Sequence, residues 1–424
     1  MKIRLSLAAL ALIVPAGLIA NTYEDNLDSL DVENPEFLLH LNLEDDFNDL
    51  GSLLSGAYMA YLATGPQNVP PIPLDFQALF NRLGLSSLKA WTMASEKVGE
   101  KGFLNQSLFR FDGAPSGYFL ITGRENRSFT IGSNAPADAD MVAEMYFDGP
   151  VLLEIVRNVL VDLMGDMGRG MIDGQLQQPI NEEGLTPQDI IDQLQSKIYV
   201  ALRADDGALV EGPPAMALLQ GPLMVSFSGL GDLLPLISPL LVQKGFTPGQ
   251  GSSGKAWKLH VGQQGFSLDL YVEAVEASGD LLLYLGEQSR DWFLNPEETI
   301  DSVAEYEDMA DQLPDEGLSF WFANERISKW QFENIDSQMP EGSPYAGVVA
   351  VGKQFLMRFT GTQAGCSFLE EDAYRVKAWQ PTSYKSGTAV ALLAIPVGML
   401  SALPPPPPPE EAPGEADGDD STPD

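Results

Sequence analysis

Residues that commonly carry out catalysis are scarce in this sequence. Its 424 residues include one cysteine, Cys366, and two histidines, His40 and His260. A zinc site needs three or four cysteine, histidine or carboxylate ligands, and the two histidines are 220 residues apart with no H-E-x-x-H motif near them. We therefore expect no metal site and no intrachain disulfide, and we interpret both histidines as surface or strand residues.

Motifs of nucleophilic catalysis are also missing. Cys366 has no histidine nearby in sequence, and a thiol nucleophile needs a base to activate it, so we interpret it as a small buried residue. The chain has no G-x-S-x-G elbow and no aspartic-protease Asp-Thr-Gly or Asp-Ser-Gly. We expect no catalytic residue and no cofactor, although a hydrolase that uses two carboxylates would leave no short motif.

One segment resembles a phosphate-binding loop by accident. Gly249 to Lys255, GQGSSGK, has the required spacing up to its lysine. Ala256 then stands where serine or threonine would bind magnesium, and a strand pattern follows where the motif requires a helix. We interpret the segment as a connecting loop.

Basic residues are also scarce. The chain has 60 acidic residues against 24 basic ones, a formal net charge of −36. A nucleic-acid partner requires clustered lysine and arginine to neutralise phosphates, so we expect none. The acidic group from Glu44 to Asp49 lacks the glycine and final glutamate of a calcium loop. We interpret it as a solvated face, with weak cation binding as the alternative.

The first twenty residues predict export. Lys2 and Arg4 precede the apolar run from Leu7 to Val14, and small residues lead to Ala20. This is the pattern of a signal peptide over residues 1–20, with an uncleaved anchor as the alternative. Removing it leaves 60 acidic and 22 basic residues, a net charge of −38. We expect the protein in the periplasm, cell envelope or extracellular space.

The end of the chain predicts a disordered tail. Residues 404–424 begin with six prolines and then contain seven acidic residues and no basic one. Before them, the uncharged segment from Thr388 to Leu403 is shorter than a membrane span, and Pro396 interrupts it. We expect a buried terminal element there, and the alternative is a membrane tether.

Capping residues predict four helices between these ends. Asp75 and Gly84 bracket the first helix. The second begins after Asp148 and carries on one stripe Leu152, Ile155, Val156, Val159, Leu160 and Leu163. Thr186 with Pro187 starts the third, and Asn295 with Pro296 starts the fourth, followed by Glu297 and Glu298 at the positive end of the helix dipole.

Alternating apolar patterns predict strands. Leu108 to Phe111 and Tyr118 to Thr122 flank a glycine-rich break, and Met141 to Phe147 forms a further strand. Lys255 to Val261, Phe266 to Glu276 and Leu281 to Gly286 predict a three-stranded meander. The resulting fold class is α+β, with antiparallel sheets covered by short helices.

The triplet Lys-Ala-Trp occurs three times, starting at Lys89, Lys255 and Lys377. The first two each follow a helix pattern and precede a strand pattern. This predicts two similar tandem α+β units, residues 21–205 and 214–403, with coincidence as the alternative because the spacings are unequal.

The segment from Gly279 to Gly286, followed by Ser289, Ser302 to Ala304, Leu313-Pro314 and Gly317, resembles a pattern in large exported bacterial proteins of unknown function. Pro136 to Ala139, ahead of a strand, is similar to another element of that pattern. The resemblance implies an exported α+β protein and brings no family chemistry with it.

These observations favour an exported, non-enzymatic protein that acts by binding or by structural interaction with an envelope or extracellular partner. The alternatives are a carboxylate-based hydrolase of glycans and an exported domain tethered to the membrane through residues 388–403. A carbohydrate groove could be lined by aromatic residues, although such residues more often form the core: Trp292, Phe293, Phe320, Trp321, Phe322 and Trp330.

Overall fold

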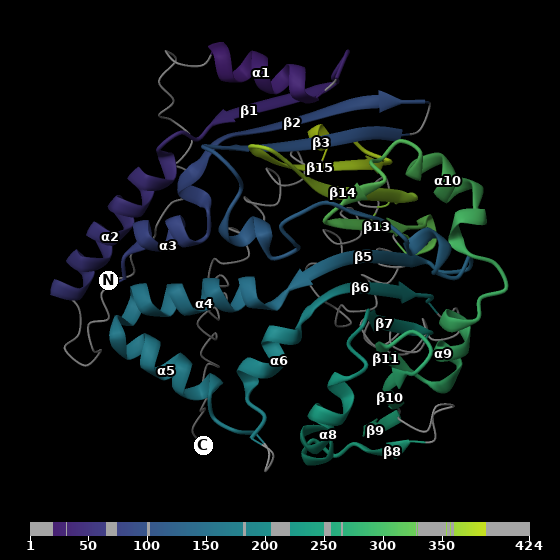
Figure 1. Cartoon of the computed structure of the whole chain (residues 1–424). Coiled ribbons are helices and arrows are strands. Elements are labelled where there is room, and N and C mark those ends of the chain that lie inside the picture. The colour runs from purple at the N-terminus through teal and green to yellow at the C-terminus, as the bar shows by residue number, and fades with distance from the viewer. Residues whose placement is uncertain are drawn as a thin grey trace, which may run out of the picture. The chain divides into compact units, whose positions relative to one another are not determined.

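An antiparallel sheet runs through a computed structural model of the protein (Figure 1). The structure describes residues 20–30, 32–64, 74–99, 102–180, 184–204, 221–249, 256–263, 266–327, 329, 353, 357 and 360–386. Within these residues the sheet has thirteen strands, in the order β1-β2-β3-β15-β14-β13-β5-β6-β7-β11-β10-β9-β8. The α+β class predicted from the sequence is confirmed.

The strand bounds follow the chain: β1 Phe37–Asn42, β2 Leu88–Val98, β3 Gly102–Phe111, β5 Met141–Asp148, β6 Gln195–Leu202, β7 Leu223–Phe227, β8 Thr247–Gly249, β9 Ala256–Gln263, β10 Phe266–Val275, β11 Asp280–Leu285, β13 Ser319–Ala323, β14 Gln363–Glu370 and β15 Ala373–Gln380. A second, two-stranded sheet pairs β4 (Arg127–Ser128) with β12 (Glu316–Gly317). The predicted meander is confirmed as β9, β10 and β11.

Strands from late in the chain complete the middle of the sheet. β3 and β5 are consecutive strands of the large sheet in sequence, yet β15, β14 and β13 lie between them. All of these strands belong to one compact unit, which ends at Tyr384. The predicted boundary at 205–214 lies outside the described residues, and the two-unit division stays a prediction.

Two hairpins near opposite edges of the sheet share a local order. Helix α3 (Phe76–Arg82) precedes the hairpin β2-β3, and helix α8 (Leu233–Gln243) precedes the strands β8, β9 and β10. Trp91 of the first triplet lies on β2 and Trp257 of the second on β9, each one strand in from an edge. The third tryptophan, Trp379, lies on β15 in the interior of the sheet.

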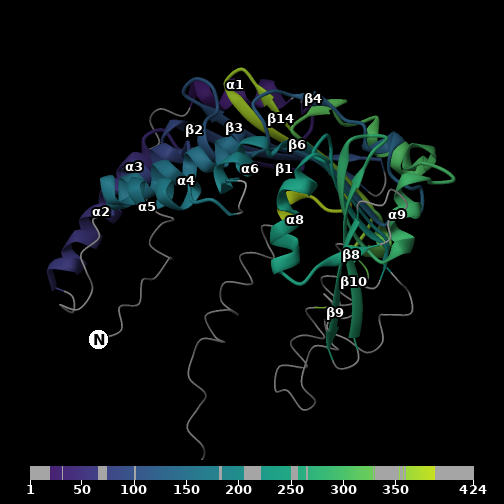
Figure 2. The same ribbon diagram turned by 60° about the horizontal axis from the view of Figure 1, so that its bottom comes forward.

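The two faces of the sheet are covered by different helices. On one face, α9 (Glu287–Leu294), α10 (Ala304–Ala310) and the short 3-10 helices η4 (Ile131–Ser133) and η6 (Ile300–Ser302) enclose the main core around Phe320, Tyr284 and Cys366. On the other face, α8 packs on Val272 and Leu281. Figure 2 shows α8 and α9 on opposite sides of β8 to β10.

Helices also gather beyond one end of the strands. These are α2 (Asp46–Thr64), α3, α4 (Gly149–Met164), α5 (Asp166–Leu176) and α6 (Pro187–Gln193), with the 3-10 helices η2 (Leu85–Ser87) and η3 (Gly117–Leu120) between them and the sheet, while α1 (Ala20–Leu30) packs on β2 and β3. Figures 1 and 2 show α2 to α5 together at this end. None of the helices in the described ranges is both long and apolar enough to cross a membrane.

Local capping explains the helices that the sequence predicted correctly. The Asp75 side chain accepts hydrogen bonds from the N–H groups of Gln77 and Ala78, and Asp148 caps α4 through Val151. Thr186 and Asp189 form a reciprocal capping box at α6. These starts depend only on neighbours in sequence.

Three local predictions were wrong, one of them in part. Tyr118 to Thr122 is not a strand: residues Gly117–Leu120 form η3, which buries Phe119 against Phe111. The predicted stripe of α4 is buried only in part: Leu160 packs against the buried Leu153, whereas Leu152 and Val156 are exposed.

The predicted fourth helix is also absent. Asn295 is the C-terminal cap of α9, and the residues after it pair with the segment before β5, where Pro136 and Thr299 form an isolated bridge. Tertiary pairing here replaces the helix that the local pattern favoured. The signal peptide up to Ile19, the segment 388–403 and the tail 404–424 lie outside the described residues.

Candidate binding site

Two loops that are far apart in sequence enclose a pocket of about 350 Å³. Residues 136–138 approach β5, and residues 295–298 follow α9. The N–H of Ala137 donates to the carbonyl of Glu298 over 3.0 Å, and the N–H of Ile300 donates to the carbonyl of Ala135 over 2.9 Å. These backbone bonds fix the loops against each other and so fix the width of the pocket.

The pocket is mostly apolar inside with acidic groups around it. Its lining consists of Pro136, Ala137, Asp138, Trp292, Asn295, Pro296, Glu297 and Glu298. No lysine or arginine belongs to this lining. An aromatic wall with a few polar groups is the usual composition of a small-molecule site.

The Trp292 side chain is held in one orientation by Asp138. Its indole Nε1 donates to Asp138 Oδ1 over 2.6 Å, and Arg203 pairs with the other carboxylate oxygen of Asp138. The Arg203 guanidinium lies 5.8 Å from the centre of the Trp292 ring. Because both of its oxygens are occupied, Asp138 positions the indole and is not free to act on a ligand.

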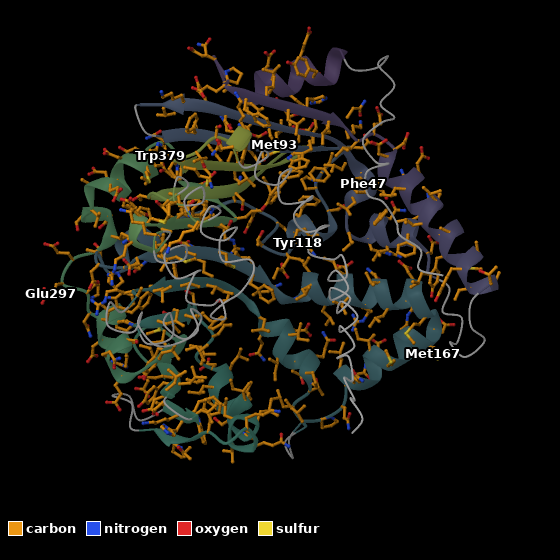
Figure 3. The ribbon with its side chains drawn as sticks, turned by 180° about the vertical axis from the view of Figure 1, so that it is seen from behind. Phe47, Met93, Tyr118, Met167, Glu297 and Trp379 are labelled. Carbon is orange, nitrogen blue, oxygen red and sulfur yellow. The ribbon has the colours of Figure 1, made fainter. Side chains whose placement is uncertain are left out.

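Glu297 and Glu298 are differently placed. Both side chains are exposed, and within the described residues neither makes a hydrogen bond or ion pair. Two unneutralised carboxylates therefore lie beside an oriented indole. Figure 3 shows Glu297 at the end of the strands opposite to Phe47 and Met167.

A second, more open pocket of about 490 Å³ lies between the hairpin β2-β3 and α10. Trp379 lies over Gly102 so closely that a Cβ at this glycine would clash with the indole ring. The pocket is lined by Val98, Gly99, Gly102, Glu305, Asp308, Met309, Gln312 and Trp379. Like the first pocket, it combines one tryptophan with exposed acids, and Figure 3 shows Trp379 on the same side as Glu297.

Besides Asp148, which caps α4, three buried carboxylates in the described residues serve the fold. Glu144, which is 2% exposed, accepts hydrogen bonds from the N–H groups of Thr130 and Ile131, each over 2.7 Å, and pairs with Lys197 at 2.6 Å. Asp140 accepts from the N–H of Ala204 and from Asn324. Glu144 ties β5 to η4, and Asp140 connects the start of β5 to the residues that follow β6 and β13. Such hydrogen-bond donors and ion-pair partners are what a buried charge needs in order to be tolerated.

Glu273 is the third buried carboxylate. It is fully buried and accepts hydrogen bonds from Tyr284 Oη at 2.8 Å and from Arg290 Nε at 2.9 Å. Burial together with this carboxylate raises the pKa of Tyr284 well above its ordinary value. Sequence reasoning missed these acids, although Glu144 and Glu273 stand at inward positions of apolar strands.

The histidines and the cysteine have structural surroundings. His40 Nδ1 lies 2.8 Å from Thr92 Oγ1 on β2, and His260 pairs with Asp269 across β9 and β10. Cys366 is buried on β14, and burial raises its pKa to about 12. All three agree with the interpretation from the sequence.

The acidic group at the start of α2 does not bring three metal ligands together. Asp46 has its pKa raised by desolvation and by its neighbours Asp49 and Asp45. Across the described part of the chain, no group of three histidine, cysteine or acidic side chains could hold a metal ion.

The suggested aromatic groove is not formed as a unit. Phe293, Phe320 and Phe322 are buried in the main core, and Trp330 lies outside the described residues. Trp292 alone of this set lines the pocket. Strands β8 and β9 are paired, and residues 250–255 of the predicted connecting loop lie outside the described residues.

An apolar surface lies at the other end of the strands. Large apolar side chains are exposed on three helices and on η3: Leu53, Met59, Tyr61, Tyr118, Leu152, Val156, Met167 and Met171. Figure 3 shows Tyr118 and Met167 on this part of the molecule.

No protein-family model, curated protein or solved structure matches this chain.

Proposed function

We propose that this protein is exported to the cell envelope or extracellular space of a bacterium and acts there by binding, without catalysing a reaction. The observation that carries the proposal is the pocket around Trp292. It combines an indole fixed by Asp138 with the exposed, unneutralised carboxylates of Glu297 and Glu298. Oriented polar groups around an apolar wall are suited to hold a ligand.

The distribution of carboxylates supports binding over catalysis. Glu144, Asp140 and Glu273 are buried, and hydrogen bonds and ion pairs that stabilise the fold occupy them. A general acid that works near neutral pH is usually kept protonated by burial, whereas the side chains of Glu297 and Glu298 are exposed.

The test uses the mature protein from its own cells. Mass spectrometry under non-denaturing conditions should detect a ligand on the native protein, and Trp292→Phe should reduce its occupancy. Fusion of residues 1–20 to a reporter enzyme should carry the reporter out of the cytoplasm. A native protein that is always empty, or a reporter that stays inside, contradicts the corresponding half of the proposal.

A glycan hydrolase is the second candidate, because Trp292 and three acids share one pocket. It predicts new reducing ends when the protein is incubated with envelope glycans, and loss of that activity in Glu297→Gln or Glu298→Gln. We expect no reducing ends to appear. The third alternative, a tether through residues 388–403, predicts a membrane fraction that disappears when this segment is deleted.

A further inference from the structure

We propose that the Trp292 pocket takes an organic cation, meaning an ammonium or guanidinium group attached to an apolar carbon chain; this rests on the binding role proposed above. The charge of the pocket is the first reason. Asp138, Glu297 and Glu298 line it with no basic residue among the lining, and Arg203 neutralises only Asp138. In a chain of net charge −36, the surrounding field also favours cations and repels anions.

The spacing of the acids excludes a bare metal ion as the preferred ligand. Calcium and magnesium require several oxygens that converge on one point. Although three carboxylates line the pocket, no group of three acidic, histidine or cysteine side chains converges in this way anywhere in the described part of the chain. The acids are distributed around a space of about 350 Å³, which is the liquid volume of about twelve waters. A ligand with a body of its own fits this space.

The indole wall favours a cation over a neutral ligand. Tryptophan is the aromatic side chain that attracts cations most strongly. The protein already contains such a contact, because the Arg203 guanidinium lies against the Trp292 ring while it forms an ion pair with Asp138. A ligand cation would repeat this arrangement with Trp292 and the unpaired carboxylates of Glu297 and Glu298.

Binding is measured on the full mature protein by calorimetry and by the indole N–H signals in NMR. The probes are 1,5-diaminopentane as a free amine and Nα-acetyl-lysine amide as a peptide side chain; the stronger of the two identifies the source of the cation. Matched neutral probes are 1,5-pentanediol and cellotriose. We expect the amines to bind and to shift the Trp292 signal, which the variant Trp292→Phe identifies by its loss.

Two double variants distinguish the effect of the pocket's charge on amine binding from the effect of the overall charge. The double variant Glu297→Gln/Glu298→Gln should weaken amine binding about tenfold, as expected for the loss of two exposed ion pairs. Glu307→Gln/Asp311→Asn, at exposed acids on and just after α10 outside both pockets, removes the same charge. This control should leave the affinity within about twofold.

Three results with the amine and diol probes overturn the inference. They are an equal loss of affinity in both double variants, equal binding of the diol, and no amine binding at all. Binding of cellotriose that Trp292→Phe weakens would also overturn it, while leaving a ligand-binding role in place. If no probe binds and the native protein carries no ligand, the proposed function falls as well.

Discussion

At the scale of single residues, the protein places its charges in two distinct ways. Glu144 and Glu273 are buried and satisfied by neighbouring donors, so they hold the sheet to loops and helices. Glu297 and Glu298 are exposed at a pocket and unneutralised within the described residues. This contrast separates structural acids from candidate binding acids in a chain where acidic residues are common.

His40 should make stability depend on pH. Burial lowers its pKa below the ordinary value of 6.5, so the unfolded chain takes up a proton that the folded protein resists. The contribution of His40 to the free energy of unfolding is therefore fully present above about pH 6.5, where the imidazole is neutral in both states. It is lost as the pH falls towards the folded pKa, because the unfolded chain is then protonated first. We expect the free energy of unfolding of the wild type, minus that of His40→Gln, to decrease between about pH 7.5 and 5.5.

Urea unfolding at the two pH values checks this. The difference between the two proteins cancels the titration of the many acids. A difference that stays constant or increases on acidification would contradict the prediction.

The Cys366 thiol should be unreactive in the folded protein. With a pKa of about 12 and 1% exposure, it supplies almost no accessible thiolate near pH 8. A thiol reagent should label less than about a tenth of the native protein in the time that labels all of it in denaturant. Since this is the only cysteine, the signal needs no assignment, and rapid native labelling would count against the burial.

At the scale of elements, the two halves of helix α2 lie in different environments. Gly51 is buried where α2 crosses α3, and a Cβ at Gly51 would lie 2.8 Å from the Cα of Gln77. Gly56, five residues later, has nothing within 4 Å of such a Cβ. The second half of the helix exposes Met59 and Tyr61.

Alanine at these two glycines should have opposite effects. Gly56→Ala should stabilise the protein by about 0.5–1 kcal/mol, because alanine has the higher helix propensity. Gly51→Ala should destabilise it by about 1–3 kcal/mol through overpacking against backbone. Urea unfolding of both variants provides the comparison, and stabilisation by both would show that propensity alone governs α2.

The same scale explains which elements the sequence predicts. Helix starts at Asp75, Asp148 and Thr186 could be read because their caps are local. The helix predicted to start at Asn295 does not form, because the segment after Asn295 pairs with a residue distant in sequence: Thr299 forms a bridge with Pro136. For the same reason the sequence identified Trp292 as a candidate aromatic residue but did not predict its contacts with Asp138 and Arg203, which are distant in sequence.

At the scale of the whole molecule, charge dominates. The chain carries a net charge of −36, and the 53 acidic and 22 basic residues between Asn21 and Leu403 still leave −31. The strand order, by contrast, could not be predicted from local sequence patterns. Late strands are inserted between β3 and β5, and this pairing joins residues that are 174 to 277 positions apart in sequence.

Salt should stabilise the protein. Like charges repel in the folded state, and the repulsion is screened over about 30 Å at 0.01 M salt but over less than 10 Å above 0.1 M. We expect the melting temperature to rise between about 0.01 M and 0.5 M sodium chloride. Sucrose at equal osmolality controls for solute exclusion, and a melting temperature that does not change with salt would refute the role of charge.

The insertion of β13, β14 and β15 also dictates an order of assembly. A chain emerging from the ribosome with its N-terminus first has made β3 and β5 long before the strands that will separate them. Until Gln380 is out, both strands present unpaired edges, the form in which sheets join to the wrong partner. A nascent chain of this protein therefore exposes two unpaired strand edges while the strands that will cover them are still being made.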